Sequence, residues 1–175
     1  KASSGALHTS IRELSGGLSL PTTTLQGPLK DILKATINEN VALIRSIPQQ
    51  YLSSVAAATQ RSITTGNGLA DLIPFLQKHK GITERRATLI ARDQTSKAYA
   101  NMNAQRLQKL GLQKFQWVHT GGTKEPRQLH KDYNGMIFSF DDLPVIDERT
   151  GEKGIPGQAI NCRCRMRPVL DLGDE

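Results

Sequence analysis

The chain has 175 residues, of which 37% are hydrophobic and 5% aromatic, so it can form one domain or two small ones with a modest core. It contains no run of about 18 apolar residues, which excludes a membrane-spanning helix, and no leader with a small-residue cleavage site. Its net charge of +7 favours an anionic partner such as nucleic acid but does not specify one. Because the first residue is Lys1 and not Met, we expect the sequence to be part of a longer polypeptide.

The first half of the chain predicts an arm followed by helices. Residues 1–27 are rich in Ser, Thr and Gly, which is typical of a flexible arm or linker that lies on another surface. From Pro28 onward, apolar residues recur at three- and four-residue steps, and Ile47-Pro48 should end this first helix. A second helix should reach the break at Gly66-Asn67-Gly68, and a short third helix should follow at about Leu69–Lys78. The residues expected to face inward in the second helix are Tyr51, Leu52, Val55, Ala58 and Ile63.

A longer helix is predicted from Thr83 to Gly111, and Gly111 is placed to cap its end. Its apolar stripe is rich in alanine and comprises Ala87, Ile90, Ala91, Ala98, Met102, Leu107 and Leu110. Its basic residues are Arg85, Arg86, Arg92, Lys97, Arg106 and Lys109. A solvated helix face is the simplest interpretation of these charges, and a stripe that follows nucleic-acid phosphates is the alternative.

After Gly111 the pattern favours strands and loops. Phe115, Trp117 and His119 alternate with other residues, which predicts a strand, and residues 136–140 give a second candidate. Residues 141–160 are expected to be loop, and a final strand should run from about residue 163 to 170. Helices followed by a small strand-and-loop module predict the α+β class, with an arm at 1–27, a helical region at 28–111 and the module at 112–175.

The two cysteines of the chain lie at C-x-C spacing, where a mutual disulfide would close a strained ring, so we expect reduced thiols. In a strand, Cys162 and Cys164 would point to the same face. With His119 and His130 they supply the four nitrogen and sulfur ligands that a structural zinc prefers, although the spacing matches no recognised finger, knuckle or ribbon. The alternative is that both cysteines are small apolar core residues and that His130 hydrogen-bonds to the backbone.

Basic residues of the module allow binding or packing roles. Arg127 and His130 lie three residues apart, so on one helical turn they would share a face. They could then bind a carboxylate or a phosphate, or they could fasten a loop to a neighbouring strand. Three alternating arginines would share the strand face opposite the cysteines and are candidates for contact with DNA or an acidic partner: Arg163, Arg165 and Arg167.

The sequence contains no complete catalytic template. A deaminase would need H-x-E followed by P-C-x-x-C, and His130-Lys131-Asp132 with a C-x-C pair does not match that pattern. A phosphate-binding glycine-rich loop and a nucleophile elbow are both missing from the sequence. A nucleophilic Cys–His pair remains open, although nothing in the sequence shows that either thiol is activated.

Several of these residues, in their order along the chain, resemble the phage Mu F-like head morphogenesis family, also called the minor head protein domain. The matching string is Trp117-x-His119-Thr120, Pro126-Arg127-x-x-His130, Asn134-Gly135-x-x-Phe138, Pro156-Gly157, Asn161-Cys162-Arg163-Cys164 and Pro168-Val169. The likeness covers roughly residues 83–170, since the helix that leads into the string is similar as well. The residues assigned to its structural motif are Trp117, Arg127, His130, Gly135, Pro156, Gly157, Asn161, Cys162 and Cys164. The family pattern would accept Thr or Ser at position 119, which counts against a zinc site that needs His119.

The resemblance implies a minor capsid protein of a tailed phage that acts in head assembly at the portal vertex. Its implied partners are the portal protein, other capsid proteins and, in some phages, the double-stranded DNA whose delivery it affects; no membrane is involved. It implies a place in the virion, and in the host cytoplasm during assembly, with no enzymatic reaction. We expect no cofactor, except that the residue types allow a structural zinc at His130, Cys162 and Cys164. The alternative is a zinc-dependent hydrolase or toxin-like enzyme that uses these three residues, and a DNA-binding protein driven by charge is a third.

Overall fold

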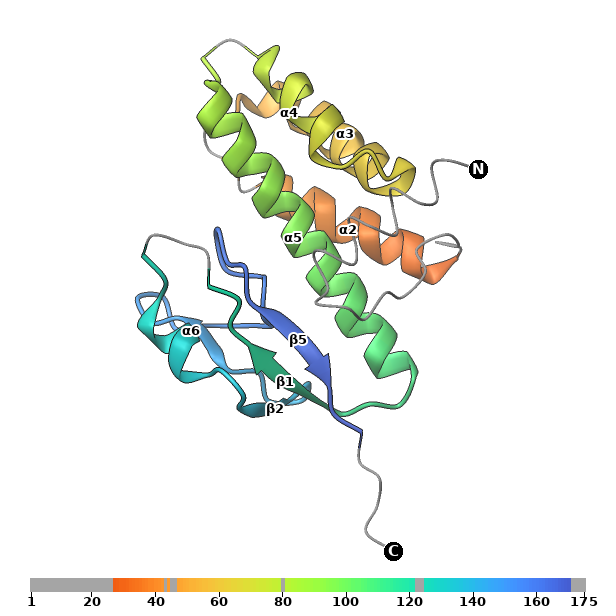
Figure 1. Ribbon diagram of the computed structural model, residues 1–175. Coiled ribbons are helices and arrows are strands. Elements are labelled where there is room, and N and C mark those ends of the chain that lie inside the picture. Colours follow the sequence, from red (N-terminus) through yellow and green to blue (C-terminus); the bar gives the residue numbers. More distant parts are fainter. Residues whose placement is uncertain (1–26, 43, 45–46, 80, 122–124, 171–175) are drawn as a thin grey trace, which may run out of the picture. The chain divides into compact units, whose positions relative to one another are not determined.

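The computed structural model describes residues 27–42, 44, 47–79, 81–121 and 125–170. The predicted arm lies, except for Gly27, outside these residues. Helices come first and a small antiparallel sheet follows (Figure 1), so the predicted α+β class is confirmed. The chain divides into two compact units at Ala98, inside its longest helix. In the described ranges, every helix is too short or too polar to cross a membrane.

The first unit is built from helices whose ends follow the predicted signals. They are α2 (Pro28–Ala42), the short 3-10 helix η1 (Gln49–Tyr51), α3 (Leu52–Thr65), α4 (Leu69–Gln77) and the first part of α5 (Glu84–Lys109). Gly66 ends α3 with a left-handed φ of 80°, which an L side chain adopts only with strain. Helix α3 contacts both α2 and α4. The buried side chains of these three helices include Leu33, Ile37, Val41, Val55, Ile63, Leu72 and Leu76.

The prediction that Tyr51 faces inward is wrong, because 41% of this residue is exposed. Pro48 is followed by η1, so α3 starts at Leu52 and Tyr51 precedes the apolar stripe of that helix. The Tyr51 ring lies against the ring of His79, with 4.9 Å between their centroids. Leu52 is half-buried, whereas Val55, Ala58 and Ile63 are buried as expected.

Helix α5 begins and ends where the sequence indicates. The hydroxyl of Thr83 accepts a hydrogen bond from the backbone N–H of Arg86 at 3.2 Å, which satisfies one donor of the first turn. Gly111, with φ 81°, ends the helix. Leu110 is 69% exposed and not buried as predicted, because it follows the last helical residue.

The basic residues of α5 are not all on a solvated face, which corrects that interpretation. Lys97 is only 8% exposed, and its ammonium lies 3.0 Å from the carboxylate of Asp93, one helical turn earlier. Arg106 is half-buried, and this burial lowers the pKa of its guanidinium. Burying a cation is costly unless it is paired, so the Asp93 contact accounts for the position of Lys97.

The second unit contains a three-stranded antiparallel sheet with β1 in the centre (Figure 1). Strand β1 (Lys114–Val118) pairs with β2 (Ile137–Ser139) on one side and with β5 (Arg165–Pro168) on the other. The short helix α6 (Gln128–Asp132) lies between β1 and β2 in the chain. Both strands predicted in residues 115–119 and 136–140 are therefore present.

Residues 141–160 are not entirely loop, which corrects the prediction for this segment. Strands β3 (Val145–Asp147) and β4 (Glu152–Lys153) form a hairpin there. Each strand is too short to produce a recognisable alternation, and the hairpin is held by the burial of Ile146. The last strand also starts two residues later than expected, at Arg165.

The core of the second unit surrounds the two cysteines. Phe115 and Trp117 are completely buried on one face of β1, as their alternation predicts. The end of α5 and the hairpin supply further members of the same cluster. Its buried members are Ala104, Leu107, Phe115, Trp117, Ile146, Ile155, Ala159, Cys162, Cys164 and Met166. The thiols thus sit within a packed apolar environment.

Candidate metal centre

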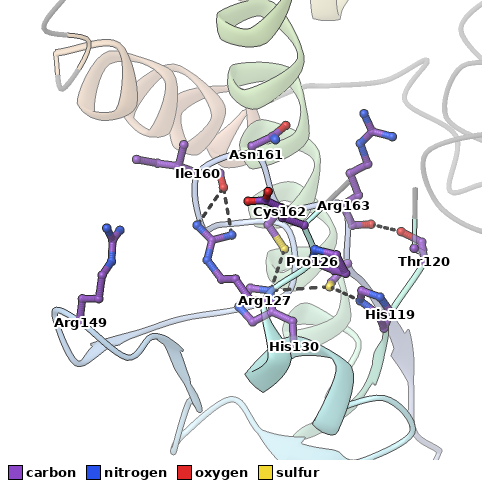
Figure 2. Close-up of a pocket in the computed structure, with 13 residues that line it drawn as sticks. His119, Thr120, Pro126, Arg127, His130, Arg149, Ile160, Asn161, Cys162 and Arg163 are labelled. Carbon is purple, nitrogen blue, oxygen red and sulfur yellow. Dashed lines mark hydrogen bonds between the residues drawn. The ribbon is translucent and has the colours of Figure 1, made fainter. Parts of the chain in front are cut away.

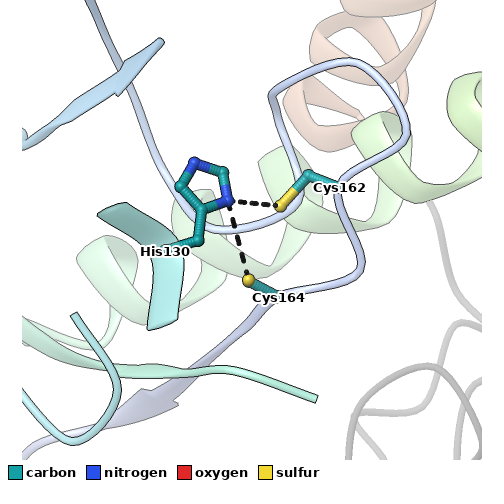
Figure 3. Close-up of side chains that lie close together, drawn as sticks. All are labelled: His130, Cys162 and Cys164. Carbon is teal, nitrogen blue, oxygen red and sulfur yellow. Dashed lines mark hydrogen bonds between the residues drawn. The ribbon is translucent and has the colours of Figure 1, made fainter. Parts of the chain in front are cut away.

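Three side chains from two segments of the second unit converge on one point (Figure 3). His130 comes from α6, and Cys162 and Cys164 come from the loop before β5. The Nδ1 atom of His130 lies 3.4 Å from Sγ of Cys162 and 3.8 Å from Sγ of Cys164. All three residues are buried, both cysteines are reduced thiols, and the three ligand atoms lie within 4.8 Å of one another. The group can therefore hold a metal ion.

The cysteines do not lie in a strand, although the sequence predicts one at this place. The chain turns at Asn161, whose φ of 55° is left-handed, and the backbone N–H of Cys162 bonds to the carbonyl of Ala159 at 3.0 Å. Asparagine tolerates this conformation better than most residues. The turn still brings both thiols to His130, so the expected common orientation is present but has a different cause.

A backbone carbonyl orients the imidazole of His130. Its Nε2 lies 2.9 Å from the carbonyl oxygen of Ile146, which can only accept a hydrogen bond, so Nε2 carries a proton. Nδ1 is then directed at the sulfur atoms. Metal-binding histidines in proteins commonly donate their other ring N–H to a carbonyl in this way, which fixes the tautomer and the orientation of the ring. Burial disfavours the charged ring, but hydrogen bonds with Cys162 and Ile146 raise the pKa of His130 above its usual value.

The two thiols shift each other's pKa in opposite directions. A hydrogen bond from Cys164 lowers the pKa of Cys162 well below its usual value despite burial, and His130 adds to this effect. The same contact and burial raise the pKa of Cys164.

Other N–H groups surround the sulfur atoms and explain several residues of the family motif. The backbone N–H of Gly157, a residue with φ 90°, helps to lower the pKa of Cys162. The indole of Trp117 and the backbone of Thr120 act on Cys164 in the same direction. The neighbouring Pro156 is completely buried. These groups favour negative charge on both sulfurs.

Arg127 fastens the loop that carries the cysteines. Its two terminal nitrogens donate to the carbonyl of Ile160 at 3.1 and 3.2 Å (Figure 2). The hydroxyl of Thr120 donates to the carbonyl of Arg163 at 2.6 Å and holds the other end of the loop. Of the roles considered for Arg127, the structure therefore shows the loop-fastening one.

Gly135 and Asn134 join α6 to the sheet. Gly135 has a φ of 84°, and its N–H donates to the carbonyl of Trp117 at 2.8 Å. The side chain of Asn134 accepts a hydrogen bond from the backbone N–H of His119 at 2.9 Å. The position of α6, and with it of His130, is thus tied to the end of β1.

His119 lies beside the three-residue group. Its Nδ1 is 3.5 Å from Sγ of Cys164, and the residue is half-buried. His119, His130 and both cysteines line a pocket of about 460 Å³, whose wall also includes Arg127 (Figure 2). The fourth potential ligand considered from the sequence is therefore close to the site but outside the group itself.

The predicted ladder of three arginines is only partly present. Arg165 and Arg167 lie in β5, where the buried Met166 between them points to the opposite face. Arg163 precedes the strand and is exposed, which corrects its assignment to the ladder. Burial lowers the pKa of the half-buried Arg165.

Sequence reasoning missed two parts of the site. One is the carbonyl of Ile146, which binds His130. The other is the hydroxyl of Thr120, which belongs to the family string but had no predicted role. A backbone acceptor has no residue-type signal. The apolar side chain of Ile146, in a short segment, indicated only burial.

Comparison with known proteins agrees with this motif. The family model described as Phage Mu protein F like protein matches residues 53–167. A Haemophilus influenzae protein described as uncharacterized is 33% identical over 136 residues; the match covers 78% of this chain and 29% of the relative. The chain thus spans less than a third of that relative. No solved structure is similar enough to count as a match. Because the family model covers well over half of its residues, the chain belongs to the Phage Mu protein F like family, as its motif predicted.

Proposed function

We propose that this chain is part of a minor capsid protein that acts in head morphogenesis of a tailed phage. The observation that carries the proposal is the family match over residues 53–167, which includes every residue of the motif around the cysteines. Most of these residues make contacts that hold the module together. Such a role suits an assembly protein, because docking requires a rigid surface more than a reactive group.

The proposed partners are the portal protein and other capsid proteins, with packaged double-stranded DNA as a further contact. The net charge of +7 and the arginines of β5 support a contact with phosphates. The protein would act in the head or at the portal vertex of the virion, and in the host cytoplasm during assembly. A DNA affinity that falls steeply with added salt, and less steeply in the double variant Arg165→Ala/Arg167→Ala, would support this contact. An affinity that does not change with salt would exclude it.

For the cysteine and histidine group we propose a structural zinc held by His130, Cys162 and Cys164. Soft thiolates with an imidazole are a typical zinc donor set. The ion would connect α6 to the loop before β5, and we propose no reaction for it. One observation favours a second candidate, a zinc-dependent hydrolase or toxin-like enzyme: the same three residues border a pocket. A hydrolytic activity lost in His130→Ala, while head assembly continues, would establish that second function.

Deletion of the gene from a phage that carries it tests the head role. We expect defective heads, and complementation by the wild-type gene should restore them. A matched pair of complementing variants is Arg127→Ala, which releases the cysteine loop, and Arg149→Ala, which removes an exposed side chain paired with Asp147. Only the first should reduce the yield of intact heads. Normal heads from the deletion strain would contradict the proposal.

A further inference from the structure

The distances around the cysteines match the edges of a zinc tetrahedron. With zinc–sulfur bonds of about 2.3 Å and zinc–nitrogen bonds of about 2.0–2.1 Å, tetrahedral geometry separates a sulfur and a nitrogen ligand by about 3.6 Å. The Nδ1 atom of His130 lies 3.4 Å from Cys162 and 3.8 Å from Cys164. The Nδ1 atom of His119 lies 3.5 Å from Cys164, so it already has the spacing of a ligand to one of the two sulfurs.

His119 is also held in a position from which its ring can reach the ion. Its backbone is fixed at the end of β1 by the side chain of Asn134. Its side chain is half-buried and lines the same pocket as the other three residues. His119 lies outside the group whose ligand atoms are all within 4.8 Å of one another. Coordination therefore requires the ring to turn toward Cys162 and His130, with little movement of the backbone.

We propose that His119 is the fourth ligand of a closed, four-coordinate zinc site completed by His130, Cys162 and Cys164. This inference rests on the structural zinc proposed above but not on the role in phage heads. Two thiolates balance the charge of Zn²⁺, and two neutral imidazoles complete the shell. The resulting centre has no net charge, which suits its buried position.

A buried donor beside Cys164 supports a thiolate at this position. The indole N–H of Trp117 is buried, has no oxygen or nitrogen acceptor among the described residues, and favours negative charge on the sulfur of Cys164. A buried donor without a good acceptor is unfavourable for the folded state. A zinc-bound thiolate at Cys164 is a stronger acceptor than a thiol and would satisfy this N–H.

Four ligands would connect two neighbouring segments, the end of β1 and α6, to the cysteine loop much later in the sequence. His119 and Cys164 are 45 residues apart, and His130 and Cys162 are 32 residues apart. Metal binding that closes such long loops stabilises the folded state, because it removes the entropy of the open chain. The site would thus join the end of β1 and α6 to the loop before β5.

X-ray absorption spectroscopy of the wild-type chain purified with zinc tests the proposal without any substitution. We expect one zinc per chain, bound by two sulfurs and two imidazoles. A shell with one imidazole, or a chain that binds no zinc under reducing conditions, would overturn the proposal. A negative zinc result would not change the outcome of the gene-deletion test of head assembly, so the two proposals can fail separately.

Variants assign the fourth ligand to His119. His119→Ala should weaken zinc binding at least about 100-fold, since the loss of an outer partner alone costs 10–100-fold. It should also reduce the intense visible absorption of Co²⁺, which reports tetrahedral coordination. His79→Ala, which removes a histidine of the first unit whose ring lies against those of Tyr51 and Phe75, is the matched control and should bind zinc like the wild type. Wild-type affinity and an unchanged Co²⁺ spectrum in His119→Ala would overturn the assignment.

Discussion

Removal of zinc should selectively destabilise the second unit. An ion that binds only the folded state stabilises it by about 2.7 kcal/mol when its free concentration is 100 times the dissociation constant. The second unit runs from Tyr99 to Glu175. For a domain of this size, 1 kcal/mol shifts the Tm by about 4–8 °C. A chelator should therefore lower the Tm of this unit by roughly 10–20 °C.

The chain contains a suitable probe for this measurement. Trp117 is its only tryptophan, it is completely buried, and its ring lies 5.1 Å from that of His130. Thermal unfolding followed by tryptophan fluorescence thus reports on the second unit alone. Cys162→Ser, which lacks one ligand, should give the same low Tm with and without zinc. A wild-type Tm that does not respond to chelation would refute the reasoning.

Three further predictions concern the support of the site. Gly154→Ala should destabilise the second unit by about 1–3 kcal/mol in urea unfolding, because the added Cβ would lie 2.7 Å from the Ile146 side chain. The carbonyl of Ile146 also contacts His130, so the site would be disturbed as well. Unchanged stability would show that the hairpin can shift to accept the Cβ without cost. Arg127→Ala should lower the free energy of unfolding by about 1 kcal/mol and weaken zinc binding, whereas Arg149→Ala should change neither quantity. Urea unfolding and zinc titration of both variants measure the two effects. In the metal-free chain, burial lowers the pKa of His130, but its hydrogen bonds raise that pKa by more, so the folded value lies above the unfolded value of about 6.5. The protonated ring therefore stabilises the fold fully below the unfolded pKa, and this stabilisation is lost as the pH rises through the folded pKa. The urea midpoint should fall over that range in the wild type but not in His130→Gln, and identical pH profiles would contradict the assignment.

Local signals in the sequence were enough to predict the class and most element ends. Thr83 and Gly111 delimit α5 because capping depends on a hydroxyl and on a left-handed glycine, both of which are visible in the sequence. Phe115 and Trp117 alternate, and both are buried on one face of β1. The hairpin at 145–153 was missed because strands of two and three residues are stabilised by tertiary packing and leave no period.

The candidate site was predictable in its residue types but not in its support. Counting nitrogen and sulfur ligands grouped His130 with the cysteines, and the structure brings them together. The reason given for the orientation of the thiols was wrong, since the turn at Asn161 and not a strand directs them. Contacts to the carbonyls of Ile146 and Ile160 were unpredictable because any residue can supply a backbone acceptor.

If this chain is the proposed component of the phage head, with a structural cysteine-containing module, purified heads should contain the protein. Quantitative mass spectrometry of purified heads, before and after DNA is released, tests it most directly. We expect a few copies of the protein per head, retained by particles that carry a portal and reduced in number in Arg127→Ala. Heads that assemble fully and contain none of the protein would contradict it.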